Sequence, residues 1–535
     1  MKKFAFLVGL MILLTSTASA AEYLTSTCQS ILPNDYVNLI KVADPDKDGK
    51  PDILVGTSVN GILYDYIYQG AECTQDWTAR SGGGWSYDTP GDVKSFVVAA
   101  LDNTGANDIV LNSASSTMNA NSKPTDYVYA IKVIKGNYAD YWNYKKECGF
   151  TNSVDVRDID KSGTPNVIMG TQSNKVCALG NDIKRDPLLW SYLAPYSGMQ
   201  VGYVKSEDID SDGNFETVAL SSKYLDAYVF ALDKAGKLRW EYRVDKGVYK
   251  ASLPSNLISV GDLEVDGYLE TVVGTYSSGV VALDKGGNVR WNYKIPNPVS
   301  SILLTDIETD NEKEVIVGGA PNVVALNSDG SVRWTWASPM KSATINSLAA
   351  YDLDGDGKLE IVAGTTRYLY VIDHDGKTKG SWKYTVEIQG LSKAAEERNS
   401  NAEAVAVGDF DSDGEPEIVA AWNWEQGTVK GNQYSTTLRL YEINQNYVPS
   451  AQDDQGVSQD DTTQTTMAQE TNNPADEQQN NAATDEQGAA TGEQTTETTL
   501  PTAPTSKIPC MPAITALIAL GVAIIVRIPF ALRRY

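Results

Sequence analysis

One acidic pattern of nine residues recurs along the first 420 residues, and it constrains the fold more than any other feature of the chain. Eight copies lie between short apolar runs, at intervals of 44 to 58 residues. Four copies read D-x-D-x-D-G-x-x-[DE], with these acidic residues: Asp44, Asp46, Asp48 and Asp52; Asp208, Asp210, Asp212 and Glu216; Asp352, Asp354, Asp356 and Glu360; Asp409, Asp411, Asp413 and Glu417. The spacing predicts one array of similar units.

The chemistry of this pattern is that of a hard cation. Alternate carboxylates at positions 1, 3 and 5 point inward when the chain curls, and glycine at position 6 takes a sharp turn that a side chain resists. Ca²⁺, with its roughly six to eight oxygen ligands, fits such a loop. An EF-hand is rejected because strands flank the loops and no Glu stands at position 12. The alternative is a set of acidic turns that bind no metal.

Three further copies keep the geometry with weaker ligands, and they are predicted to be weaker calcium sites. Their candidate ligands are Asp158, Asp160, Ser162 and Asn166; Asp262, Glu264, Asp266 and Glu270; Asp306, Glu308, Asp310 and Glu314. In the last of these copies Asn311 replaces glycine, and asparagine tolerates a left-handed turn. The remaining copy keeps only Asp102, Thr104, Gly105 and Asp108, so we expect a turn without metal there.

Each repeat contains four strand signals in a fixed order. In the seventh repeat these are residues 346–351, the acidic loop, 360–364, 368–373 and a last strand with Trp382 and Tyr384. Four strands in about fifty residues is the repeat of a β-propeller blade. We therefore predict an all-β fold over residues 21–445, with eight, or alternatively seven, four-stranded blades. The last repeat lacks its fourth strand, which residues 22–28 are expected to supply.

Two family resemblances follow from these motifs. The acidic loop with its flanks, as in residues 405–419, resembles the FG-GAP or VCBS repeat of integrin α-subunit propellers. The segments that end in Trp240, Trp291 and Trp334 resemble the quinoprotein (PQQ-like) propeller repeat, and their regular spacing predicts blade-to-blade core tryptophans. The first resemblance implies a propeller with calcium in its loops, and it does not specify a biochemical activity.

The ends of the chain predict a protein of the cell surface. Residues 1–20 have the pattern of a signal peptide. Residues 446–507 are rich in Thr, Gln, Asp and Glu and predict a disordered stalk. Residues 508–526 predict a transmembrane helix, and 527–535 a short basic cytoplasmic tail. The tail also resembles the sorting tails of archaeal surface proteins, but its Pro-containing junction departs from their pattern, so simple anchoring with the propeller outside is favoured.

Cysteine usage and charge narrow the function further. In an oxidising compartment we predict the disulfides Cys28–Cys73 and Cys148–Cys177, with free buried thiols as the alternative. Cys510 stands alone near the predicted membrane end. The net charge of −25 excludes nucleic acid as a natural partner, because phosphates would be repelled.

Long insertions are expected on the face opposite the acidic loops, at residues 78–92, 112–126, 386–402 and 422–434. Function on a repeat scaffold usually lies in its loops, so these insertions predict a surface that binds an extracellular protein or glycan. The candidate ligand-binding residues are Trp85, Tyr87, Trp422, Trp424, Glu425 and Tyr434. The alternative is that these aromatic side chains pack under their own loops.

The single histidine, His374, lies in a predicted hairpin turn, which excludes catalytic triads and zinc hydrolases. No catalytic residue is predicted, and the favoured function is a calcium-binding adhesion or binding module. Three alternatives stay open: an extracellular lyase-like enzyme that acts on polysaccharides, a quinoprotein-like dehydrogenase, and a structural component of the cell envelope.

Overall fold

The computed structural model divides the chain into two units, Met1–Asp460 and Asp461–Tyr535, and every residue that it describes lies in the first. The described residues are 23–33, 35–58, 61–66, 85–88, 92–102, 107–113, 127–134, 137–144, 148–180, 187–195, 198–223, 226–244, 257–276, 279–384, 401–428 and 431–444. The predicted signal peptide, stalk, membrane helix and basic tail lie outside them. Within the described part of the chain, no helix has the length and apolarity needed to cross a membrane.

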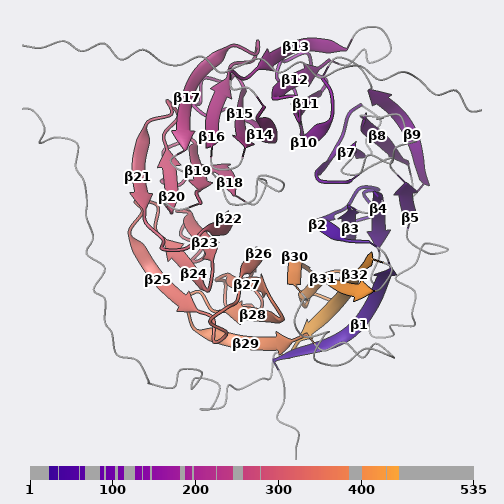
Figure 1. Ribbon diagram of the computed structural model, residues 1–535, viewed down its shortest axis with the longest axis vertical. Helices are drawn as coiled ribbons and strands as arrows, with labels where there is room; N and C mark the ends of the chain where they lie inside the picture. Colours follow the sequence, from indigo (N-terminus) through magenta and orange to yellow (C-terminus); the bar gives the residue numbers. More distant parts are fainter. Residues whose placement is uncertain are drawn as a thin grey trace, which may run out of the picture. The chain divides into compact units, whose positions relative to one another are not determined.

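Eight antiparallel sheets of four strands each are arranged in a ring, with the first strand of each sheet nearest the centre (Figure 1). This confirms the predicted all-β propeller of eight blades. The strands of blades 1 to 4 are β2 (Val37–Ala43), β3 (Asp52–Thr57), β4 (Ile62–Tyr66) and β5 (Trp85–Asp88); β6 (Phe96–Ala99), β7 (Asp108–Ser113), β8 (Tyr127–Ile134) and β9 (Asn137–Tyr144); β10 (Thr151–Arg157), β11 (Asn166–Thr171), β12 (Lys175–Leu179) and β13 (Leu188–Leu193); β14 (Gln200–Glu207), β15 (Glu216–Lys223), β16 (Asp226–Leu232) and β17 (Leu238–Val244).

The strands of blades 5 to 8 follow the same order, except that the last blade takes its outer strand from the start of the chain. They are β18 (Ile258–Gly261), β19 (Glu270–Gly274), β20 (Val280–Leu283) and β21 (Val289–Tyr293); β22 (Val299–Thr305), β23 (Glu314–Gly319), β24 (Asn322–Leu326) and β25 (Val332–Ala337); β26 (Ile345–Tyr351), β27 (Glu360–Thr365), β28 (Tyr368–Ile372) and β29 (Thr378–Lys383); β30 (Asn401–Gly408), β31 (Glu417–Thr428), β32 (Gly431–Ile443) and β1 (Leu24–Pro33).

Strand β1 closes the ring by pairing with β32, so that the first and the last described strands lie side by side (Figure 1). The pairing runs from Leu24 opposite Ile443 to Pro33 opposite Ser435. The backbone N–H of Asn444 also donates to the carbonyl of Tyr23 at 2.9 Å. The sequence predicted this closure, although the strand extends five residues beyond the predicted end at Cys28.

The burial pattern explains why the middle strands are continuous apolar runs. Strands β3, β11, β23 and β27 are buried along their whole length, because each blade is covered on both faces by its neighbours. The outer strands instead alternate, as β13 does between half-buried and exposed residues. The core is therefore a set of clusters between adjacent blades.

The recurring tryptophans lie at the outer edge of these clusters. Each indole N–H donates to a carbonyl in the turn between the third and fourth strands of the next blade, at 2.7 to 2.9 Å. The four pairs are Trp190 with Lys234, Trp240 with Lys285, Trp291 with Ser328 and Trp334 with His374. These side chains are only half-buried. The predicted blade-to-blade contact is present, but it lies at the rim and not in the core.

The turn that receives each indole contains a glycine with a left-handed backbone. At Gly287 φ is +80°, and an added Cβ would come within 2.7 Å of the Trp240 ring. Gly376 repeats this arrangement under Trp334, at 2.8 Å. Glycine is required at these turns both by conformation and by the close approach of the ring.

A disulfide joins Cys148, just before β10, to Cys177 in β12, with Cα atoms 6.4 Å apart. This is the pairing that the sequence favoured, and it links the start of blade 3 to its third strand. The side chains of Cys28 and Cys73 lie outside the described residues, so the other predicted pairing stays a prediction.

Candidate metal centre

The acidic loops connect the first strand of each blade to the second, and position 9 of each loop is the first residue of that second strand. In blades 1, 3 to 6 and 8, the carboxylate at position 1 accepts the N–H groups of positions 5 and 6, whereas in blade 7 Asp352 accepts those of Gly355 at position 4 and Gly357 at position 6. In blade 8, Asp409 accepts from Asp413 and Gly414, both at 3.0 Å. The same pair of bonds forms in blade 1, where Asp44 accepts from Asp48 at 3.1 Å and from Gly49 at 2.9 Å. The first aspartate thus curls the loop around itself.

Two left-handed residues make this curl, one at position 4 and one at position 6. In blade 8 these are Ser412, with φ +64°, and Gly414, with φ +93°. Asn311 takes the position of the glycine in blade 6 with φ +81°, as its sequence predicted. The loop conformation is therefore the same in the strong and the weak copies of the motif.

Where position 9 is an acid, it is the most buried acid of its loop. Glu417 is 3% exposed, and its Oε2 accepts the backbone N–H of Phe410, at position 2, at 2.8 Å. Glu360 and Glu314 do the same for Leu353 and Ile307, at 2.8 and 3.0 Å. One carboxylate oxygen of each of these glutamates therefore holds the loop.

The loops differ in how far they bring their predicted ligands together. In blade 8, Asp409, Asp411, Asp413 and Glu417 all place a carboxylate oxygen within 4.8 Å of one another. In other loops only three of the predicted ligands meet in this way: Asp44, Asp46 and Asp48; Asp208, Asp210 and Glu216; Asp352, Asp354 and Asp356. Among the described residues, the predicted ligands of blades 3, 5 and 6 form no such group.

A basic side chain, which the sequence reasoning missed, enters four of these loops from the fourth strand. It bridges the acids at positions 3 and 9. In blade 4, Arg239 pairs with Asp210 at 2.6 Å and with Glu216 at 2.7 Å. The equivalent contacts are Arg290 with Glu264 and Glu270 in blade 5, Arg333 with Glu308 and Glu314 in blade 6, and Lys379 with Asp354 and Glu360 in blade 7. A sequence signal existed, because each arginine directly precedes the recurring tryptophan.

The basic residue changes the electrostatics of its loop. Although burial opposes it, the hydrogen bond from Lys379 lowers the pKa of Asp354 at position 3 of blade 7. The corresponding residue of blade 8, Asp411, has a raised pKa, because it is partly desolvated and lies beside Asp413. Burial raises the pKa of Glu360 to about 6 and that of Glu417 to about 8. Of these two loops, the loop of blade 8 therefore has the negative charge that is less compensated by a basic side chain.

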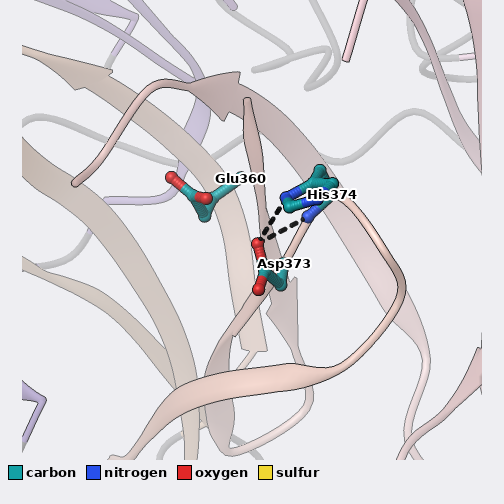
Figure 2. Close-up of side chains that lie close together, drawn as sticks. All are labelled: Glu360, Asp373 and His374. Atoms are coloured by element: carbon teal, nitrogen blue, oxygen red, sulfur yellow. Dashed lines mark hydrogen bonds and ion pairs between the residues drawn. The ribbon is translucent and has the colours of Figure 1, made fainter. Parts of the chain in front are cut away.

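A second group of metal-binding residue types lies in blade 7, where Asp373 faces His374 and Glu360 (Figure 2). The imidazole Nδ1 of His374 is 2.8 Å from Asp373 Oδ1, and its Nε2 is 3.2 Å from the Nζ of Lys358. The Nζ of Lys379 lies 2.9 Å from Glu360 and 3.7 Å from Asp373. Both imidazole nitrogens and both acids already have protein partners, so this group is a charge network within the hairpin turn.

The predicted ligand surface needs a correction at blade 8. Residues 422–434 do not form a looping insertion, because β31 and β32 continue as a regular hairpin up to Thr428 and Gly431. Trp422 has no exposed surface, stacks on Tyr384 and donates its indole N–H to the Tyr441 hydroxyl at 2.9 Å. It belongs to the core between blades 7 and 8, and its predicted role in ligand binding is wrong.

The structure neither supports nor contradicts ligand binding by the other candidate residues. Trp424 lies two residues further along β31 and is half-buried. The backbones of Trp85, Tyr87, Glu425 and Tyr434 lie in strands β5, β31 and β32, but their side chains lie outside the described part of the structure. Their role in binding stays a prediction.

Comparison with known proteins gives one family match. The model of the FG-GAP-like repeat matches residues 352–420, from the loop of blade 7 to the second strand of blade 8. This match confirms the resemblance for that segment. No curated protein matches the sequence.

The chain also matches several solved structures. Sqt1 of Saccharomyces cerevisiae is 11% identical over 78% of this chain and 98% of its own, with a TM-score of 0.52. BBS1N, crystallised in complex with ARL6DN, is 12% identical over 70% of this chain and 99% of its own, with a TM-score of 0.42. The biofilm matrix protein Bap1 of V. cholerae is 14% identical over 79% of this chain and 90% of its own, with a TM-score of 0.35. At 11% identity, the likeness to Sqt1 concerns the fold alone.

Proposed function

We propose that this chain, a β-propeller with FG-GAP-like repeats, is a binding module of the cell surface whose blade loops bind calcium. The observation that carries the proposal is the loop of blade 8, where Asp409, Asp411, Asp413 and Glu417 place carboxylate oxygens within 4.8 Å of one another. No ion pair involves any of these four acids among the residues that the structure describes. Four acids that close together repel each other unless a cation joins them.

Calcium is the cation that suits these ligands. All the side-chain donors are oxygens, which favours a hard cation over zinc or copper. The loop is exposed at positions 4 to 7 and is shaped by two left-handed residues, so it can adjust to the irregular coordination that Ca²⁺ accepts and Mg²⁺ does not. The ion acts structurally, because it binds the folded loop and thereby stabilises the folded state.

The partner is proposed to be an extracellular protein or a glycan. A closed ring of eight blades is a rigid scaffold, and on such scaffolds the connecting loops usually carry recognition. The predicted signal peptide, stalk and membrane helix would hold this ring outside the cell. An enzymatic role is not proposed, because the group around the single histidine consists of acids and bases already paired with each other.

The test is a calcium titration of the full-length chain purified in mild detergent. Thermal unfolding is followed with calcium and with a chelator, and bound metal is counted on the folded protein. We expect a higher unfolding midpoint with calcium. The free energy of unfolding should rise by about 2.7 kcal/mol when free calcium is about 100 times the dissociation constant. The variant Asp409→Asn should lose most of this gain. A folded protein without bound calcium and with the same midpoint in chelator would contradict the proposal.

A further inference from the structure

We propose that the basic residue of the fourth strand decides which blade loops bind calcium. Arg239, Arg290, Arg333 and Lys379 act as built-in cations that replace the metal in blades 4 to 7. Calcium binding is then confined to loops that lack such a residue, and blade 8 is the strongest of them. This inference rests on the proposed function, since it specifies which of the loops take the ion.

The four basic residues occupy one structural position. In blade 4, Leu232 pairs with Leu238 and Ala231 with Trp240, so Arg239 is the extra residue of a β-bulge. The same register shift places Arg290, Arg333 and Lys379 at the bulges of blades 5, 6 and 7. A bulge re-aims a side chain. In all four blades it brings the basic group to the acids at positions 3 and 9, although 19 to 29 residues separate the partners in sequence.

Each basic group contacts two of the predicted metal ligands of its loop. The glutamate at position 9 is almost fully buried in all four blades, with a side-chain exposure of 0 to 4%. One of its oxygens already accepts a backbone N–H, and the other accepts the basic side chain. A calcium ion would have to displace an arginine or lysine from a buried carboxylate. Separating such a pair leaves an unpaired buried charge and is strongly unfavourable.

Blade 3 shows a matched change at both positions. Its bulge residue is Leu189, and its position 9 is Asn166. The Asn166 Oδ1 accepts the N–H of Ile159 at 2.8 Å, as Glu Oε2 does elsewhere. An amide group replaces the second carboxylate oxygen, so no basic side chain is required there. Blades 4 to 7 therefore have both the basic residue and the acid at position 9, and blade 3 has neither.

Blade 8 breaks this rule, because no basic side chain pairs with its loop acids in the part of the chain that the structure describes. Its bulge lies in β1, between Ser26 and Cys28, which makes Thr27 the equivalent of Arg239. Glu417 is nevertheless a buried acid with the same backbone contact as the glutamates of blades 4 to 7. A threonine cannot neutralise it, and a bound Ca²⁺ would supply the charge that the chain omits.

A second structural trait separates the same loops. In blades 4 to 7 neighbouring loops are joined by backbone bonds from position 8 to position 2 of the preceding loop: Leu269 to Ile209, Lys313 to Leu263 and Leu359 to Ile307, at 2.9 to 3.2 Å. Blades 1, 3 and 8 have Pro51, Pro165 and Pro416 at position 8, which cannot donate. The loops with built-in cations thus form a continuous backbone chain that needs no metal, and the proline-bearing loops stand outside it.

The first experiment exchanges the bulge residues and counts bound calcium on the full-length chain by atomic emission, with binding followed by calorimetry. Thr27→Arg should lose about one calcium ion per chain and become more stable in chelator. Thr25→Arg is the control, because it adds the same charge to an exposed position of the same strand. Equal calcium content in Thr27→Arg and wild type would overturn the inference.

The reverse exchange is Arg239→Met, which should gain about one calcium ion per chain. Its control is Arg243→Met in the same strand, whose side chain is 68% exposed and pairs only with Asp226 among the described contacts. If the wild type binds calcium but Arg239→Met gains none while folded, the inference fails and the proposed function stands. If the wild type binds none and Arg239→Met gains an ion, the proposed function fails together with calcium binding at blade 8, and only the exclusion of calcium by the basic residue is supported. If neither protein binds calcium, both fail.

Discussion

Blades 7 and 8 are neighbours with nearly the same loop, yet their loops are electrostatically different. Both read D-x-D-x-D-G-x-x-E, and both bury the final glutamate against the N–H of position 2 at 2.8 Å. In blade 7 the Nζ of Lys379 lies 2.9 Å from Glu360, whereas the equivalent residue in blade 8 is Thr27. The motif therefore specifies the loop conformation, and a residue of the fourth strand specifies the charge that the loop still lacks.

The difference coincides with a difference in connectivity. Blade 7 is built from one continuous segment, but blade 8 receives its fourth strand, β1, from the beginning of the chain (Figure 1). Under the proposed function, a calcium ion in blade 8 would bind beside the strand that closes the ring. Metal binding would then stabilise the closure, whereas the loop of blade 7 would be stable without metal.

The largest effect is expected from the core that blades 7 and 8 share. Trp422 is fully buried and stacks on Tyr384 with ring centroids 4.8 Å apart. Trp422→Ala should destabilise the protein by about 3–5 kcal/mol, in calcium and in chelator alike, because it leaves a large cavity. Urea unfolding measures this. The half-buried Trp424 is the control, and an equal loss in Trp424→Ala would show that the burial difference between the two positions does not govern stability.

The two position-9 glutamates should respond in opposite directions to loss of charge. Glu360→Gln weakens the ion pair with Lys379 and should cost about 1–3 kcal/mol, whether or not calcium is present. Glu417→Gln removes an uncompensated buried charge, so it should stabilise the protein in chelator and abolish most of the gain from calcium. Thermal unfolding of both variants, with calcium and with chelator, measures these changes in stability. Destabilisation of both variants in chelator would mean that blade 8 has a cation partner of its own.

The fold could be predicted because its determinants are local and repeated. The acidic loops, the four strand signals and the missing last strand all appear in sequence order, and β1 closes the ring where expected. The disulfide between Cys148 and Cys177 could likewise be predicted, because the two cysteines are only 29 residues apart in the sequence. The burial of Trp422 could not be predicted. The sequence of residues 422–434 fits a looping insertion as well as it fits two longer paired strands, and the structure has the longer strands.

The role of the basic residues was hidden for a different reason. Arg239 and Glu216 are brought together by strand pairing and by a one-residue bulge, and neither the bulge nor its direction is encoded in spacing alone. The left-handed backbone at position 6 of the loops followed from glycine and asparagine, but the one at position 4 did not, because that position holds Lys, Ser, Val or Thr in most loops. The sequence thus predicts the position of each candidate site. The net charge of the site becomes known only from the strand pairing, which shows whether a basic side chain reaches the loop.

A smaller effect is expected when blade 7 is converted to the state of blade 8. Lys379→Met removes the cation from Asp354 and Glu360, which should destabilise the protein by about 1–3 kcal/mol in chelator. Calcium should restore part of this loss, because the loop then has four acids and no internal partner. The control is Lys377→Met, an exposed residue two positions away that pairs with Asp375. A loss that calcium does not reduce would show that the conformation of this loop is incompatible with the ion.

The smallest effect concerns pH in the metal-free protein. Burial raises the pKa of Glu417 to about 8 from an ordinary value of 4.5, so the folded state holds this proton more tightly than the unfolded state. The resulting stabilisation is fully present below pH 4.5 and is lost as the pH rises through 8. After allowance for screening we expect on the order of 1 kcal/mol over this interval.

Glutamine cannot titrate, so Glu417→Gln in chelator should show a shallower decline in stability between pH 5 and pH 8, roughly the interval in which Glu417 loses its proton. In Glu360→Gln the change should end earlier, since the pKa of Glu360 is raised only to about 6. The difference between these two variants above pH 6 therefore isolates the blade that lacks a built-in cation. Parallel pH profiles of the two variants would mean that Lys379 and Thr27 leave their loops equally compensated, and the distinction between blades 7 and 8 would then have no energetic basis.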